Sequence, residues 1–177
     1  MKTTMFVSGA ALVGLLCSLS LAAQQKESIA GVRNYTRVDA TVACAGATSV
    51  DSIPEIKRQG FVSIINFRLP TEPDANVEAE GNAARAAGIK YIHLPFNAAM
   101  PDSAVVEAFL KAVVDKSNQP AFIHCGSASR VGGMWLIKRA LVDRWPVEKA
   151  TAEAEAIGLA NPGLKAFALD YVKTHAK

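Results

Sequence analysis

Two periods of hydrophobic and polar positions alternate along the chain, and each change of period marks the boundary of an expected element. Apolar runs rich in β-branched and aromatic residues predict strands at 61–67, 90–96 and 120–125, with one or two shorter strands between Tyr35 and Cys44. Stretches with a helical period or with capping residues predict helices at 49–58 (from Ser49 or Ser52), 77–87, 102–114, 131–142, 146–157 and 163–174. Strands that alternate with helices are typical of an α/β fold, here a central, mostly parallel sheet of four to five strands flanked by helices.

The most regular helical pattern follows Asp102, which is placed to cap the helix. Apolar residues recur there every three or four positions, at Val105, Val106, Phe109, Leu110, Val113 and Val114. This spacing predicts one buried stripe along the helix.

The first residues follow a different pattern, that of an export signal. Lys2 precedes an apolar run from Met5 to Leu21, and two small residues, Ala22 and Ala23, come next. This layout predicts a Sec-type signal peptide over residues 1–23 and a single folded domain over 24–177. A retained membrane anchor is the alternative, but the run is short for a span. We therefore expect a periplasmic or secreted protein without stable membrane insertion after cleavage.

Composition narrows the possible functions. The chain has 177 residues, of which 50% are hydrophobic and 20% charged, as in a single globular domain. The formal net charge is +3 and no basic block is present, so nothing indicates a nucleic-acid partner. The expected mature chain keeps two cysteines, Cys44 and Cys125, and an oxidising compartment would allow them to pair or to stay free.

The clearest chemical signal lies between the last predicted strand and the helix after it. This segment reads His124-Cys125-Gly126-Ser127-Ala128-Ser129-Arg130. A cysteine at the end of a strand and the start of a helix meets unpaired backbone N–H groups that stabilise a thiolate and a bound anion. The sequence predicts Cys125 as a nucleophile, residues 126–129 as an oxyanion cradle, and Arg130 as the guanidinium that binds oxyanion oxygens.

Two neighbours of this cysteine have more than one possible role. If the strand alternates, His124 points away from Cys125, and it either orders the loop or is a satisfied core histidine. Ser129 either assists departure of the thiolate in a second step or caps the helix.

The His124-Cys125 pair, followed by four residues and Arg130, resembles the cysteine-dependent tyrosine and dual-specificity phosphatases. The likeness is closer to the phosphatase-like domains of bacterial beta-lactamase hydrolase-like proteins. It extends over about residues 35–145 and includes, in order, Cys44-Ala45-Gly46, the helix up to Arg58, Ile64-Ile65-Asn66-Phe67-Arg68 with Glu72, Tyr91-Ile92-His93-Leu94-Pro95, and the His-Cys loop.

The resemblance implies a phosphatase that needs no metal or other cofactor. The Cys125 thiolate would attack phosphorus and form a phosphocysteine, which water then hydrolyses. The loop N–H groups and Arg130 would hold the phosphoryl oxygens. The expected substrates are phosphorylated small molecules or proteins, of the phosphotyrosine or small aryl phosphate type.

The sequence departs from the phosphatase pattern in two ways. Four residues separate Cys125 from Arg130, where most of these phosphatases have five, and rhodanese-type sulfurtransferases share the shorter loop. The position of the usual general acid falls near Asn97, which cannot supply a proton as an acid. Asp102 is the next candidate, although capping competes with that role. A sulfurtransferase carrying a Cys125 persulfide and an oxyanion-binding module without turnover therefore stay open as alternatives.

Arg68 and Glu72 follow a predicted strand and have two possible arrangements. They line the substrate pocket, or they pair with each other on the surface. Cys44 is either a buried free thiol or the disulfide partner of Cys125.

Overall fold

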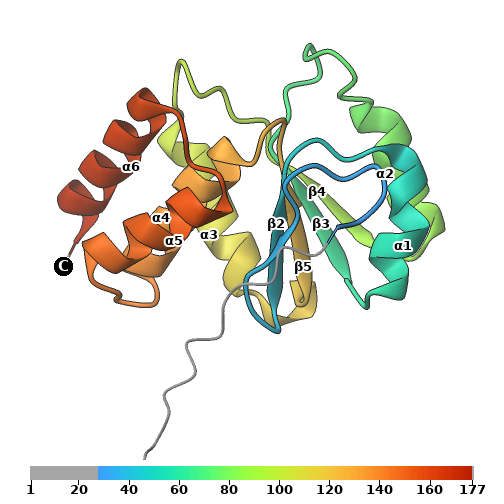
Figure 1. The fold of residues 1–177 in the computed structure, drawn as a ribbon, viewed down its shortest axis with the longest axis horizontal. Helices are drawn as coiled ribbons and strands as arrows, with labels where there is room; N and C mark the ends of the chain where they lie inside the picture. The colour runs from blue at the N-terminus through green and yellow to red at the C-terminus, as the bar shows by residue number, and fades with distance from the viewer. Residues whose placement is uncertain (1–27, 177) are drawn as a thin grey trace, which may run out of the picture.

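Five strands form one sheet at the centre of the fold in the computed structural model, which describes residues 28–176 (Figure 1). The strands are β1 (Thr36–Arg37), β2 (Val42–Ala45), β3 (Ser63–Asn66), β4 (Lys90–His93) and β5 (Ala121–His124). Their order is β1-β2-β5-β3-β4, with β1 antiparallel to β2 and the other pairings parallel. The predicted sheet is therefore confirmed, whereas the signal-peptide prediction for residues 1–23 lies outside the described residues.

Helices cover both faces of this sheet. One face carries α1 (Ile53–Arg58) and α2 (Val77–Ala86). The other carries α3 (Ser103–Val114), α4 (Ser129–Leu141), α5 (Val147–Ile157) and α6 (Pro162–His175). Two short 3₁₀ turns, η1 (Val50–Ser52) and η2 (Lys116–Asn118), precede α1 and β5. Figure 1 shows α1 and α2 on the right of the sheet and α3 to α6 on the left.

Local chemistry explains where several elements begin and end. Gly60 and Gly88 lie just beyond α1 and α2 with φ of +86° and +67°, a left-handed conformation that favours glycine. The side chain of Asp102 accepts a hydrogen bond from the Ala104 N–H at 2.8 Å and so caps α3, as predicted. The buried stripe on α3 is also confirmed, except that Val114, the last helical residue, is 46% exposed.

The start of α4 differs from the prediction. The helix begins at Ser129 rather than at residue 131, because Ala128 takes a left-handed conformation with φ of +75° and turns the chain into the helix. Arg130 therefore lies in the first turn of α4.

Successive side chains along β5 point to opposite faces of the sheet, so His124 and Cys125 lie on different faces. Ile123 and Cys125 belong to the core beneath α3 to α6, together with Trp135. Phe122 lies in the core beneath α1 and α2, and the ring of His124 lies beside it with centroids 5.9 Å apart. The side chain of His124 therefore points away from Cys125, as the alternation predicts. Within residues 28–176, no helix is long and apolar enough to cross a membrane.

Candidate active site

Cys125 follows the carboxyl end of β5 and opens the loop that leads into α4. Its backbone N–H donates to the Ala45 carbonyl at 3.3 Å, which continues the pairing of β5 with β2 for one more residue. The side chain is buried in the core. Strand pairing and burial together fix the position of the sulfur at the base of the loop.

The loop after Cys125 has its carbonyl groups turned toward the protein. The carbonyl of Gly126 accepts a hydrogen bond from the Ala47 N–H at 3.0 Å, and that of Ser127 accepts one from Asn34 Nδ2 at 3.1 Å. Among the described residues, the N–H groups of Gly126, Ser127 and Ala128 have no acceptor. Three unpaired donors beside a helix N-terminus form a cradle suited to an anion.

Arg130 is held over this loop by several acceptors. It donates to both carboxylate oxygens of Glu72, at 2.5 and 2.8 Å, and to the carbonyls of Phe67 and Phe96 at 3.0 and 3.1 Å. A Cβ placed on Gly126 would lie 3.3 Å from Arg130 Nη2 and 3.4 Å from Glu72 Oε2. The guanidinium and its partner carboxylate therefore lie directly against the loop.

The ion pair also sets the charge of Glu72. Burial disfavours the carboxylate, but hydrogen bonds from Arg130 and from the Leu69 N–H outweigh this effect and lower the pKa of Glu72 to about 2. Burial likewise opposes the charge on Arg130, yet Glu72 and the Cys125 sulfur raise the pKa of Arg130 above its ordinary value. Glu72 is thus a carboxylate, and not a proton donor, near neutral pH.

Arg68 is nearly buried and supports the Glu72 segment. Its Nε donates to Glu72 Oε2 at 3.2 Å, and its remaining donors bind the backbone carbonyls of Pro73 and Asp74. Arg68 and Glu72 contact each other, but Arg68 is buried rather than on the surface. Glu72 lines a pocket with Arg130, and Arg68 does not.

A buried polar cluster lies behind the loop on the other face of the sheet. Nε2 of His124 is 2.9 Å from Oε1 of Glu80 on α2, close enough for an ion pair although the angle is outside the hydrogen-bond range, and both side chains are 1% exposed. Asn66 Nδ2 and the Tyr91 hydroxyl donate to Glu80 Oε2 at 2.7 and 3.0 Å. Burial and the Glu80 charge raise the pKa of Tyr91. The cluster supports the loop-ordering role for His124.

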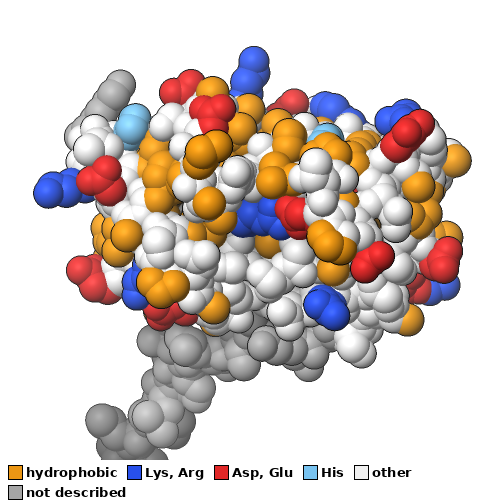
Figure 2. Space-filling view, turned by 90° about the horizontal axis from the view of Figure 1, so that it is seen from above, with side chains coloured by type: hydrophobic (Ala, Val, Ile, Leu, Met, Phe, Trp, Pro, Cys, Tyr) orange, Lys and Arg blue, Asp and Glu red, His pale blue; other side chains and the backbone are white. Residues whose placement is uncertain are grey.

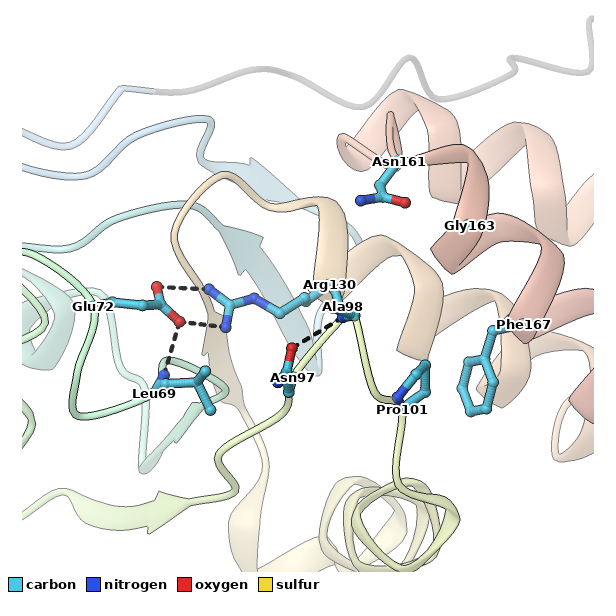
Figure 3. Close-up of a pocket in the computed structure, with 10 residues that line it drawn as sticks. Leu69, Glu72, Asn97, Ala98, Pro101, Arg130, Asn161, Gly163 and Phe167 are labelled. Atoms are coloured by element: carbon cyan, nitrogen blue, oxygen red, sulfur yellow. Dashed lines mark hydrogen bonds and ion pairs between the residues drawn. The ribbon is translucent and has the colours of Figure 1, made fainter.

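A pocket of about 750 Å³ opens beside Arg130 (Figure 3). Its lining residues are Leu69, Glu72, Asn97, Ala98, Ala99, Pro101, Arg130, Asn161, Gly163 and Phe167. In the space-filling view from above, a patch of Lys or Arg side chains lies mid-face beside an acidic group and among hydrophobic side chains (Figure 2). Asp102 does not line this pocket, and its carboxylate is engaged in capping α3.

Ser129 and Cys44 have defined surroundings. The Ser129 hydroxyl accepts hydrogen bonds from the N–H groups of Ala160 and Asn161, both at 3.2 Å, so it connects α4 to the segment before α6. Cys44 and Cys125 are both buried and free. Cys44 pairs with Ile123, so Cys125 is one diagonal step away, about 8 Å between Cα atoms and beyond the reach of a disulfide without backbone movement.

Sequence reasoning missed Glu80 and the pocket wall on α6. Glu80 reads as a surface position of α2, and Phe167 reads as a core position of α6. Neither residue belongs to a motif near Cys125, so only the folded chain brings them to the site.

The fold is that of the cysteine-based phosphatases. TpbA of P. aeruginosa has a TM-score of 0.66 and 20% identity, with 88% of this chain and 91% of that chain covered. The core catalytic domain of SIW14 from S. cerevisiae, a PP-IP phosphatase, has a TM-score of 0.66 and 20% identity, covering 83% of this chain and 93% of that one. A DUF442 protein of Shewanella putrefaciens CN-32 has a TM-score of 0.71 and 19% identity, covering 84% and 97%.

Within this class, the chain belongs to the family of phosphatase-like domains of beta-lactamase hydrolase-like proteins, whose model matches residues 34–142. The beta-lactamase hydrolase-like protein of Agrobacterium fabrum is 30% identical over 112 residues, which are 61% of this chain and 25% of that protein. The one from Xylella fastidiosa is 27% identical over 128 residues, which are 70% and 28%. The match thus spans about a quarter of the length of these relatives.

Proposed function

We propose that this protein is a cysteine-dependent phosphatase that hydrolyses phosphomonoesters of the phosphotyrosine or small aryl type. The observation that carries the proposal is the loop after β5, where a buried cysteine, three unpaired N–H donors and a fixed guanidinium meet at one place. Membership of the phosphatase-like family supports it.

The proposed reaction has two displacements at phosphorus. The Cys125 thiolate attacks phosphorus, the P–O bond to the leaving group breaks, and a phosphocysteine forms. Water then attacks the phosphocysteine, the S–P bond breaks, and inorganic phosphate leaves as the thiolate is restored. The loop N–H groups and Arg130 hold the phosphoryl oxygens through both steps, so their work is positioning and charge stabilisation.

The residues that line the pocket offer no protonated carboxylic acid, which favours leaving groups that depart without a proton. Glu72 is the one carboxylic residue among those that line the pocket, and its pKa of about 2 keeps it ionised. Asn97 occupies the loop where the resemblance places the general acid, and its Oδ1 accepts a hydrogen bond from the Ala99 N–H at 2.9 Å. Aryl phosphates suit such a site because a phenolate needs less protonation than an alkoxide.

The number of positive charges in the pocket also distinguishes between substrates with one phosphate group and substrates with several. One structure of TpbA was solved in complex with phosphotyrosine, and SIW14 is a PP-IP phosphatase. Among the residues that line the pocket here, Arg130 is the only cation. A single guanidinium suits one phosphate group better than a polyphosphorylated ligand.

Hydrolysis of para-nitrophenyl phosphate tests the proposal. We expect turnover at mildly acidic to neutral pH, inhibition by vanadate, and complete loss with Cys125→Ser. Arg130→Lys should lower kcat/KM by about 100-fold, because a point charge replaces the bidentate fork. Thiosulfate-to-cyanide transfer is the companion assay, and a Cys125-dependent signal there without phosphatase activity would establish a sulfurtransferase instead.

The pocket without a protonated acid also favours a second candidate, an oxyanion-binding module without turnover. This candidate predicts phosphate binding that survives Cys125→Ser and is lost with Arg130→Ala, measured by calorimetry. Turnover that depends on Cys125 would contradict it.

Export to the periplasm or the outside of the cell is also part of the proposal, on the sequence pattern of residues 1–23. Fractionation of cells and the mass of the mature protein test it. A mature chain that starts after Ala22 or Ala23 is the expected result, and a full-length chain in the cytoplasm would contradict it.

A further inference from the structure

One wall of the pocket beside Arg130 comes from a part of the chain that the family model does not include. The model ends at residue 142, whereas Asn161, Gly163 and Phe167 lie before or within α6 and line the pocket. Figure 3 shows Phe167 and Pro101 on the side of the pocket away from Glu72. Three of the residues that line this pocket therefore lie outside the matched segment.

The α6 wall is joined to the anion-binding residues by direct contacts. The ring of Phe167 lies against that of Phe96, with centroids 6.1 Å apart, and the carbonyl of Phe96 accepts a hydrogen bond from Arg130 at 3.1 Å. On the other side, the Ser129 hydroxyl binds the backbone just before α6. Two sets of contacts, one through Phe96 and one through Ser129, thus connect the wall to Arg130 and to the start of α4.

Close packing of α6 against α4 leaves this wall little freedom to shift. A Cβ placed on Gly133 of α4 would lie 3.0 Å from Cγ of Leu164, so the Leu164 side chain would have to move by a few tenths of an ångström to admit it. Leu164 itself is 1% exposed. The wall is therefore packed closely against α4.

The chemistry of the pocket fits an uncharged ring. Half of its lining residues are apolar: Leu69, Ala98, Ala99, Pro101 and Phe167. The two charged ones, Glu72 and Arg130, form an ion pair with each other. Phe167 and Pro101 give this side of the pocket an apolar surface on which a flat aromatic group would pack, and among the described residues the wall carries no charged side chain to pair with a charged leaving group.

We infer that Phe167 determines specificity by packing against the aryl group of a phosphomonoester whose phosphate is bound by the Cys125 loop. This inference rests on the proposed phosphatase function. It assigns the ring of the substrate to the part of the pocket lined by Phe167 and Pro101, on the side of Arg130 opposite Glu72.

Two substrates whose leaving groups both depart without protonation separate ring recognition from acid catalysis. Both para-nitrophenyl phosphate and acetyl phosphate lose their leaving groups without protonation, but only the first carries a ring. With Phe167→Ala we expect kcat/KM to fall about fivefold or more on para-nitrophenyl phosphate and to stay within about twofold on acetyl phosphate. Phe167→Tyr should restore the aryl activity, and Leu169→Ala, on α6 but outside the pocket, should leave both activities unchanged.

Equal losses on the two substrates, or no loss on either, would overturn the inference. Failure of the proposed function has a different signature, namely no Cys125-dependent turnover of either substrate by the wild-type protein. Affinity gives a readout that does not need turnover: Cys125→Ser protein should bind phenylphosphonate more tightly than methylphosphonate in calorimetry, and Phe167→Ala should remove the difference. Equal affinities in the Cys125→Ser protein would also overturn the inference.

Discussion

Arg130 owes its orientation to a carboxylate from a distant part of the chain. Glu72 accepts from both terminal nitrogens of the guanidinium, and two backbone carbonyls take further hydrogen bonds. Such a bidentate pair fixes the plane of the fork as well as its position. A fork fixed before the substrate arrives needs no rearrangement during the reaction.

Replacing Glu72 by Gln should lower kcat/KM on para-nitrophenyl phosphate by about 10- to 100-fold, because Arg130 loses its fixed geometry. Steady-state kinetics measure the effect, with Glu78→Gln as the control because Glu78 is exposed on α2. Unchanged kinetics in Glu72→Gln would show that the carbonyl contacts alone hold the guanidinium.

The same pair predicts a pH dependence of stability. The ordinary pKa of this carboxyl is 4.5, and its pKa in the folded protein is about 2. A lowered pKa means that the pair stabilises the fold above pH 4.5 and loses this contribution as the pH falls from 4.5 toward 2. Urea unfolding of wild type and Glu72→Gln should therefore give free energies whose difference is largest at pH 6 and becomes steadily smaller as the pH falls from 4.5 toward 2. A constant difference would contradict the assignment.

Glu80 illustrates how much a buried polar residue depends on its partners. Glu80→Ala removes the one carboxylate that meets His124, Asn66 and Tyr91, and leaves their polar atoms buried without it. We expect a loss of about 3 kcal/mol in the free energy of unfolding. The exposed Glu78→Ala on the same helix should change it by less than about 0.5 kcal/mol, and similar losses in both variants would show a helix effect instead.

At the scale of elements, α4 connects the candidate active site to α5 and α6. Gly132 lies where α4 meets the end of α5, and a Cβ there would be 2.7 Å from the Ala154 carbonyl oxygen. Gly132→Ala should therefore cost about 1–3 kcal/mol of unfolding free energy, because backbone atoms must move apart. Gly163→Ala is the matched control, since its Cβ would meet nothing closer than 3.4 Å and alanine favours a helix. Thermal or urea denaturation measures both.

The sequence predicts most elements because their signals are local. The cap at Asp102, the stripe on α3 and the apolar run of β5 each act over a few neighbouring residues. The start of α4 is the exception. Its first turn is set by the left-handed conformation of Ala128, which apolar periodicity does not reveal.

At the scale of the whole molecule, the candidate site divides into a contiguous part and an assembled part. Cys125, Arg130 and the residues between them could be predicted because a single loop carries them. Glu80 and Phe167 could not, because strand order and helix packing alone bring them near the loop. Glu72 was identified as a candidate, but its partner Arg130 became evident only in the folded chain.

The buried Cys44 thiol should not react with alkylating agents in the native protein. Burial, with smaller effects from Glu153 and Asp39, raises the pKa of the Cys44 thiol well above its ordinary value. Iodoacetamide should leave Cys44 unmodified in native protein and modify it after denaturation, as measured by peptide mass mapping. Cys44→Ala should keep phosphatase activity, and loss of Cys125-dependent turnover in that variant would show that the two thiols act together.

The Ser129 hydroxyl at the start of α4 accepts hydrogen bonds from the segment just before α6. This contact has a consequence for how relatives in the family can diverge. The proposed nucleophile and its loop lie before residue 142, whereas Phe167 lies after it. The two stretches contact each other along α4 and through two backbone N–H groups that donate to the Ser129 hydroxyl. A chimera that exchanges the segment after residue 142 between relatives would then inherit its catalytic rate from one parent and its substrate preference from the other. New preferences can arise in this way without any change to the nucleophile.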